Sequence, residues 1–387
     1  MRLLKTAIQN KIQESPETIH RLTPLLQSKN EEELLRFVED PKDELEDFHA
    51  LLKIIRTLFP ERERELMEDY CLNLDPEKES MSIGLIYSFI TNFKTLEKSL
   101  VLLISKSGYD KELAELSSIA LKVKQKQMNE LKGIELLYEY NESPSSIVKA
   151  FANVLQSSFY FNLRMIDFYL QLSIITKRLI DQVENQYIRY LFKARMSLLE
   201  TAGYVAIGLT DDGKQIGVEA LKNTDEPYMK YMFHVFIGNS FLFDDYENAK
   251  LNFETAIESI EIYDDITPND AYRSHNFLNN FWGKPPIFLN DQSDHISDIH
   301  EIAFYYIRND NPDKGLGVLD SIDSLLLNDS QKGFHNYYRG LATQQLDYFY
   351  ESILHFNYAG EKYFKKFPIH ELEKSGVSNT LIRVLSS

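Results

Sequence analysis

The stretch Gly238–Ile257, GNSFLFDDYENAKLNFETAI, constrains the fold of this chain more than any other segment. Small and aromatic residues occur in it at the three- and four-residue steps of a helix, after one glycine. In chain order these positions are Gly238, Tyr246, Ala249, Phe253 and Ala256. A glycine lets two helices cross closely, and aromatic side chains fill the space between neighbouring helix pairs. The pattern therefore predicts a helical hairpin in which Gly238 marks the crossing.

The same pattern recurs further along the chain, which predicts a repeat. Towards the end it reads Gly340, Phe349, Ser352, Phe356 and Ala359. A weaker copy lies between the two, at Ala303, Gly315, Leu319 and Ile322. Small and aromatic residues at these offsets are typical of tetratricopeptide hairpins. Each hairpin buries its remaining apolar face on the next, so residues 59–387 are predicted to form a tetratricopeptide-like solenoid with a concave groove.

The rest of the chain also carries helical periodicity, so the predicted fold class is all-α. Glycine (15) and proline (12) are scarce among 387 residues, and 43% of the residues are apolar. The longest apolar run, near Leu100–Ile104, is too short to span a bilayer. The start of the chain has no apolar signal-peptide core. A cytoplasmic protein is therefore expected, with its single cysteine, Cys71, as a core thiol.

The first 58 residues form a separate pattern of short helices. Helices are expected over 3–13, 16–26, 31–38 and 45–59, and a tight turn joins the second to the third. This arrangement suits a helix-turn-helix DNA-binding domain over residues 1–58, although any small helical bundle has a similar pattern. Seven residues are predicted to contact DNA: Lys5, Lys11, Arg21, Ser28, Lys29, Asn30 and Arg36.

The charge distribution bears on that prediction. The net charge is −17, which argues against nonspecific coating of nucleic acid. Residues 1–30 nevertheless carry more cations than anions, so a small cationic head can touch DNA locally. Ordinary fluctuation in a short window is the alternative explanation.

Motifs of catalysis are missing from the sequence. Neither a phosphate-binding glycine loop nor an HExxH zinc motif occurs. His295 and His300 lie near two aspartates, but their spacing fits no standard metal site. No enzymatic activity, metal or cofactor is predicted.

The groove is expected to hold an extended peptide. Asn239 follows the crossing glycine, and Asn279 and Asn280 take a similar position in the next unit. Asparagine amides pair with both N–H and C=O groups of a peptide backbone. Glu301 and Glu361 add carboxylates that suit an arginine or a free amine. The alternatives are a cap or turn role for each asparagine and a solvated face for each glutamate.

The segment 379–387, NTLIRVLSS, predicts a homodimer contact. One helix-turn-helix per chain reads half a site, so tight specific binding needs two copies. The apolar positions of this segment are Leu381, Ile382, Val384 and Leu385. Packing onto the chain's own last repeat is the alternative.

Several blocks of the sequence resemble one known family, the arbitrium receptors (AimR) of temperate Bacillus phages. The resemblance covers nearly the whole chain. It rests on FPERERELMEDYCLNLD, FIGNSFLFDDYENAKLNF, FLNNFW and FPIHELEKSG. It implies a dimeric transcription regulator with a helix-turn-helix and a tetratricopeptide-like body, acting in the cytoplasm of the bacterial host. It also implies that the regulator activates a gene favouring lysis, and that a short imported peptide, hexapeptide-like and containing arginine, turns it off so that lysogeny follows.

The resemblance also implies positions for the peptide. The family's peptide-pocket positions correspond here to Asn239, Leu242, Phe277, Glu301, Glu361 and Tyr363. Where the family can carry an arginine before the GNS block, only Lys230 offers a cation. A competing enzymatic function is that of a tetratricopeptide-type response-regulator aspartate phosphatase regulated by a peptide.

Overall fold

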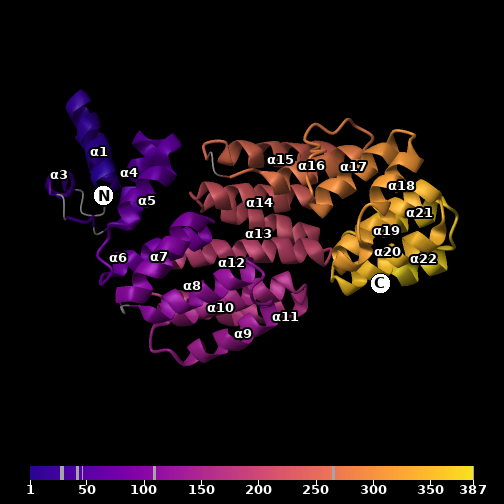
Figure 1. Cartoon of the computed structure of the whole chain (residues 1–387), viewed down its shortest axis with the longest axis horizontal. Coiled ribbons are helices and arrows are strands. Elements are labelled where there is room, and N and C mark those ends of the chain that lie inside the picture. Colours follow the sequence, from indigo (N-terminus) through magenta and orange to yellow (C-terminus); the bar gives the residue numbers. More distant parts are fainter. Residues whose placement is uncertain (27–29, 41–42, 46, 108–109, 264–265, 387) are drawn as a thin grey trace. The chain divides into compact units, whose positions relative to one another are not determined.

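The computed structural model describes residues 1–26, 30–40, 43–45, 47–107, 110–263 and 266–386, and those residues contain helices but no strand (Figure 1). The predicted all-α class is therefore confirmed. None of the described helices is long and apolar enough to cross a membrane.

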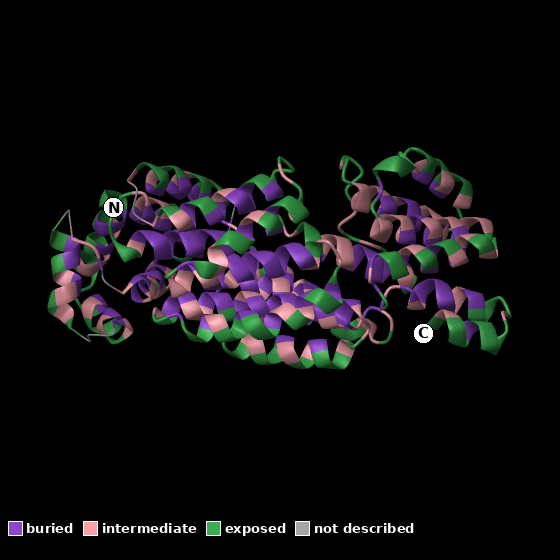
Figure 2. Ribbon diagram, turned by 90° about the horizontal axis from the view of Figure 1, so that it is seen from below, coloured by how far each residue is buried: buried purple, intermediate pink, exposed green. Residues whose placement is uncertain are grey.

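The chain divides into two compact units. The first comprises Met1–Phe159, Leu172–Met196 and Ile262–Asp265, and the second comprises Tyr160–Gln171, Ser197–Glu261 and Ile266–Ser387. In both units buried residues lie on the helix faces that pack together, and exposed residues lie on the outer faces (Figure 2).

The first unit begins with five helices that include the predicted helix-turn-helix. They are α1 (Arg2–Glu14), α2 (Glu17–Leu22), α3 (Glu31–Glu39), α4 (Phe48–Leu58) and α5 (Glu63–Cys71). Asn30 caps α3 by accepting a bond from the Glu32 N–H at 3.0 Å, and Asp47 caps α4 in the same way. The second helix is shorter than expected: it ends at Leu22, and a 3-10 turn containing Pro24 follows. Proline has no N–H to continue an α-helix.

Of the helices that follow, α6 to α9 belong to the first unit, and α10 to α12 contribute residues to both units. They are α6 (Glu79–Ile90), α7 (Lys94–Ser107), α8 (Lys111–Lys124), α9 (Glu130–Leu137), α10 (Ser146–Asn162), α11 (Ile166–Asp181) and α12 (Gln186–Ala206).

The boundary predicted after residue 58 stays a prediction. The N-terminal ammonium group of Met1 lies 2.9 Å from an Asp69 carboxylate oxygen in α5, and the Tyr70 hydroxyl donates to the Leu45 carbonyl. Contacts between the head and α5 thus cross that boundary.

The second unit contains the predicted repeats. Its helices are α13 (Thr210–Lys222), α14 (Pro227–Asn239), α15 (Tyr246–Ile260), α16 (Asn269–Phe281), α17 (Ile296–Arg308), α18 (Pro312–Asp320), α19 (Asp329–Thr343), α20 (Leu346–Tyr358), α21 (Lys366–Lys374) and α22 (Asn379–Ser386).

The crossing glycines explain the pairing of these helices. A Cβ added to Gly238 would lie 2.5 Å from the Phe253 ring, and one added to Gly340 would lie 2.6 Å from the Phe349 ring. Only a glycine allows α14 to approach α15, and α19 to approach α20, this closely. In the weaker copy, Gly315 of α18 crosses α17 beside the Ala303 carbonyl. All three predicted hairpins are present in the structure.

Candidate functional site

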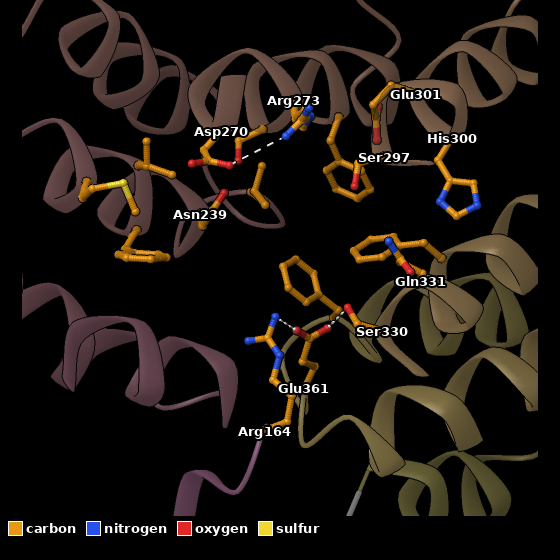
Figure 3. A pocket seen from close by; sticks show the side chains of 18 of the residues that line it. Arg164, Asn239, Asp270, Arg273, Ser297, His300, Glu301, Ser330, Gln331 and Glu361 are labelled. Atoms are coloured by element: carbon orange, nitrogen blue, oxygen red, sulfur yellow. Dashed lines mark hydrogen bonds and ion pairs between the residues drawn. The ribbon is translucent and has the colours of Figure 1, made fainter. Parts of the chain in front are cut away.

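A pocket of about 420 Å³ lies within the second unit (Figure 3). Helices α14, α16, α17 and α19 form its walls, together with the turn after α10 and the turn after α20. Its lining residues are Phe161, Arg164, Met232, Val235, Phe236, Asn239, Leu242, Asp270, Arg273, Ser274, Phe277, Ser297, His300, Glu301, Ser330, Gln331, Phe334, Tyr338, Glu361 and Phe364. Five of the nine residues predicted to bind a peptide are among them: Asn239, Leu242, Phe277, Glu301 and Glu361.

Asn239 enters the pocket from the last turn of α14. The lining residues Met232, Val235, Phe236 and Asn239 recur at three- and four-residue steps, so they share one face of that helix. Asn239 is half-buried, and within the described part of the chain its amide makes no hydrogen bond with another side chain. Its donor and acceptor are therefore available to a ligand backbone.

Glu361 is held in place from two sides. Its carboxylate lies 3.0 Å from an Arg164 guanidinium nitrogen and accepts a hydrogen bond from the Ser330 hydroxyl at 2.6 Å (Figure 3). The Glu361 side chain is almost fully buried, whereas Arg164 is partly exposed. A cationic ligand at Glu361 must therefore share this carboxylate with Arg164.

Glu301 is the second carboxyl group of the pocket, and it has no cationic partner among the described residues. Tyr338 and Asn280 each donate a hydrogen bond to it at 3.1 Å. Burial raises its pKa to about 8, against an ordinary value of 4.5. Glu301 is therefore neutral at pH 7 in the free protein, whereas the sequence suggested a ready carboxylate.

Arg273 and Arg164 bring cations into the pocket that the sequence analysis missed. The guanidinium group of Arg273 forms two bonds with the Asp298 carboxylate, at 2.8 and 3.0 Å. Asp270, more exposed, lies one helical turn before it. The signal was present in the sequence: Arg273 lies four residues before Phe277, and this spacing places both on one face of a helix.

A pair of buried histidines lies at the α17–α19 side of the pocket. The rings of His300 and His335 approach to 3.3 Å, and Arg339 donates to the other nitrogen of His335 at 2.9 Å. Burial lowers the pKa of His300 to about 3 and that of His335 to about 4, so both are neutral at pH 7. Because Arg339 must donate, the nitrogen of His335 that faces His300 carries the proton.

Four of the predicted peptide-binding residues do not line the pocket. Asn279 is buried and accepts a hydrogen bond from the Tyr246 hydroxyl. The side-chain amide of Asn280 donates a hydrogen bond to the Glu301 carboxyl group. Tyr363 is fully buried and donates to the Ser240 carbonyl. Lys230 lies nine residues before Asn239, which places it on the opposite face of α14. The structure thus places these four residues outside the pocket lining, and their contact with a peptide stays a prediction.

The predicted DNA contacts are placed unequally in the first unit. Lys5 is buried and donates to the Asp40 and Asp43 carbonyls, and its contact with DNA stays a prediction. Lys11 is partly exposed and pairs with Glu14 at 2.9 Å, and Arg21 is exposed at the end of α2.

Helix α3, which follows the predicted tight turn, has few side chains available to contact DNA. Asn30 serves as its N-cap, and Arg36 pairs with Asp43 at 2.9 Å. Its first turn consists of three glutamates. Ser28 and Lys29 lie outside the described residues.

Helix α22 divides the four predicted dimer residues into two faces. Ile382 and Leu385 pack on the core of the second unit. Leu381 and Val384 are exposed, at 38% and 64%. Packing on the last repeat therefore accounts for the first two residues, and only the other two remain placed for a partner.

The fold and the site together define a class of helical-repeat proteins with an N-terminal helix-turn-helix and a pocket within the repeats. Residues 63–374 match the family model of AimR transcriptional regulator-like proteins. The chain belongs to that family, which is one of transcriptional regulators.

Individual relatives agree with this assignment. The AimR transcriptional regulators of Bacillus phages phi3T and SPbeta are each 27% identical to this chain, over 98% and 100% of its length and over their own full length. A solved structure of phAimR with a ligand is 26% identical with a TM-score of 0.79, covering 87% of this chain and 100% of that one. A selenomethionine phAimR structure, also at a TM-score of 0.79, covers 99% of this chain and 100% of that one.

Proposed function

We propose that this protein is a phage transcriptional regulator that controls the choice between lysis and lysogeny, and that a short signalling peptide in the pocket of the second unit switches it off. Family membership supports the regulatory role. The observation that carries the peptide proposal is the pocket itself, where Asn239, Glu301 and Glu361 line one cavity.

The chemistry of the lining residues suits a peptide with one cationic side chain. The free amide of Asn239 pairs with the peptide backbone, and Phe277 offers an apolar wall. An arginine of the peptide forms an ion pair with Glu361, in competition with Arg164. Alternatively, it pairs with Glu301 after that carboxyl group loses its proton. Arg273 and Arg164 suit a carboxylate of the ligand.

Operator binding is proposed for the N-terminal helices, acting as a homodimer. Of the predicted contacts, the exposed Arg21 and the partly exposed Lys11 are proposed to meet phosphates. Leu381 and Val384 supply the exposed apolar face for a two-fold contact. The alternative, a peptide-regulated aspartate phosphatase, is not favoured, because the family that matches is one of transcriptional regulators.

The test is calorimetry of the full chain with arginine-containing hexapeptides. Asn239→Ala removes a partner of the peptide backbone, so we expect peptide affinity to fall by about 1–3 kcal/mol, roughly fivefold to a hundredfold or more. Lys230→Ala, on the opposite face of the same helix, is the matched control and should leave the affinity unchanged. Equal losses in both variants, or none in either, would contradict the proposed site.

A further inference from the structure

The second unit contains another cavity, of about 400 Å³, which shares no lining residue with the peptide pocket. Three lysines line it, so we call it the lysine cavity. Its lining residues are Ile207, Gly208, Phe243, Lys362, Lys365, Lys366, Ile369, His370, Glu373 and Ser386. In a chain with a net charge of −17, such a concentration of cations at one cavity is a local exception.

Lys365 is the central feature of this cavity. The residue is only 4% exposed, and no hydrogen bond or ion pair satisfies its ammonium group among the described residues. Burial, and then the neighbouring Lys362, lower its pKa. The nitrogen is not among the unpaired atoms that are fully shut off from water, so the ammonium group is only partly dehydrated, at a cost in free energy. An anion in the cavity would supply the missing partner.

The neighbouring groups reinforce this charge. Lys362 is exposed beside the cavity, and Lys366 lies 4.9 Å above the Tyr363 ring. Glu373 is the one anion of the lining, and it lies 4.0 Å from a nitrogen of His370. The three lysines outnumber this carboxylate, so the cavity favours a ligand of negative charge.

Helix α21 presents one side to the cavity, from Lys366 in its first turn to Glu373 in its last, so its backbone termini contribute little. The first backbone N–H groups are already used, since Lys366 and Phe367 donate to the Tyr363 and Phe364 carbonyls. The side chains, and Lys365 above all, must therefore supply the direct contacts.

We propose that the lysine cavity binds a small phosphate-bearing anion, with Lys365 as its buried partner and Lys362 and Lys366 as its outer partners. Lysine ammonium groups are common phosphate partners in proteins. The volume exceeds that of inorganic phosphate, and Phe243 and Ile369 line the remainder with apolar surface. An organic phosphate fits this combination, and inorganic phosphate is the minimal probe.

Calorimetry of the full chain at constant ionic strength tests the proposal, with inorganic phosphate in one arm and adenosine monophosphate in the other. We expect binding in at least one arm. Lys365→Met keeps the length of the side chain and removes the charge, so it should weaken binding tenfold or more. Lys374→Met is the matched control: this exposed lysine lies at the other end of the same helix and should bind as the unmodified protein does. Tighter binding of the nucleotide identifies an organic phosphate as ligand, and equal binding identifies the inorganic ion.

Thermal unfolding provides a second measurement that misfolding cannot mimic. Without phosphate, Lys365→Met should unfold at the same temperature as the unmodified protein or above it, because it removes an unpaired buried charge. Phosphate should then raise the unfolding temperature of the unmodified protein and of Lys374→Met, but not that of Lys365→Met. Absence of binding in both arms, or undiminished binding by Lys365→Met, would overturn the proposal.

Discussion

At the scale of single residues, the two carboxyl groups of the peptide pocket have different surroundings. Glu361 faces the guanidinium group of Arg164 and the hydroxyl group of Ser330. Glu301 faces only the neutral donors Tyr338 and Asn280. Since burial without a cation favours the protonated form, Glu301 is one group whose titration affects stability near neutral pH.

Glu301 makes the stability of the protein pH-dependent in a defined direction. Its pKa is about 8 in the folded protein and near 4.5 when unfolded, so between these values only the folded state holds the proton. Its stabilising contribution is complete below pH 4.5 and is lost as the pH rises through 8, by up to about 1.4 kcal/mol per pH unit. Glutamine does not titrate, so the free energy of unfolding of Glu301→Gln should not share this loss. Measured by urea unfolding, it should rise by about 2 kcal/mol relative to that of the unmodified protein between pH 5.5 and 7.5. A difference that is constant with pH would contradict this account.

The sequence predicts which residues line the pocket where helical spacing alone decides the direction of a side chain. Asn239 follows the crossing glycine, and the structure places it in the pocket as expected. Lys230 was expected at the pocket as a nearby cation, but nine residues along a helix lead to the opposite face, and it does not line the pocket. Arg164 could not be found in this way, since it lies in a turn after α10 and reaches Glu361 through tertiary packing alone.

At the scale of elements, the repeat was predictable because its crossing geometry leaves a direct trace in the sequence. Gly238 and Gly340 each face an aromatic ring of the paired helix, at the offsets from which the hairpins were predicted. Helix ends were less predictable: the early end of α2 at Leu22 depends on Pro24, and the start of α4 depends on the Asp47 cap. A proline or a capping residue can end or start a helix within a segment whose apolar periodicity continues, so helix boundaries predicted from periodicity shift by a few residues.

The crossing glycines predict opposite effects for two similar substitutions. In Gly238→Ala the added methyl group would lie 2.5 Å from the buried Phe253 ring, so we expect a loss of about 1–3 kcal/mol. Gly317→Ala in α18 meets no atom within 4 Å and should gain up to about 1 kcal/mol from helix propensity. Chemical unfolding of both variants measures the difference. Similar effects of the two substitutions would show that the crossing is not close-packed.

At the scale of the whole molecule, the exposed face of α22 predicts how two copies associate. Replacing Leu381 and Val384 by glutamate should convert a dimer to a monomer in light scattering, because two charges would enter an apolar contact. Leu325 and Leu326 are exposed apolar residues elsewhere in the second unit, and the same change there is the control. A dimer that survives the first pair of substitutions would place the two-fold contact elsewhere.

The central claim is that peptide in the pocket and operator DNA on the N-terminal helices bind to competing states of one molecule. Linkage requires each ligand to weaken the other by the same factor. The direct measurement is calorimetric titration of peptide into the full chain, alone and with saturating operator DNA. The account predicts a lower peptide affinity with operator present, and an equal loss of operator affinity with peptide present. The same peptide affinity in both titrations would contradict it, even if both ligands bind.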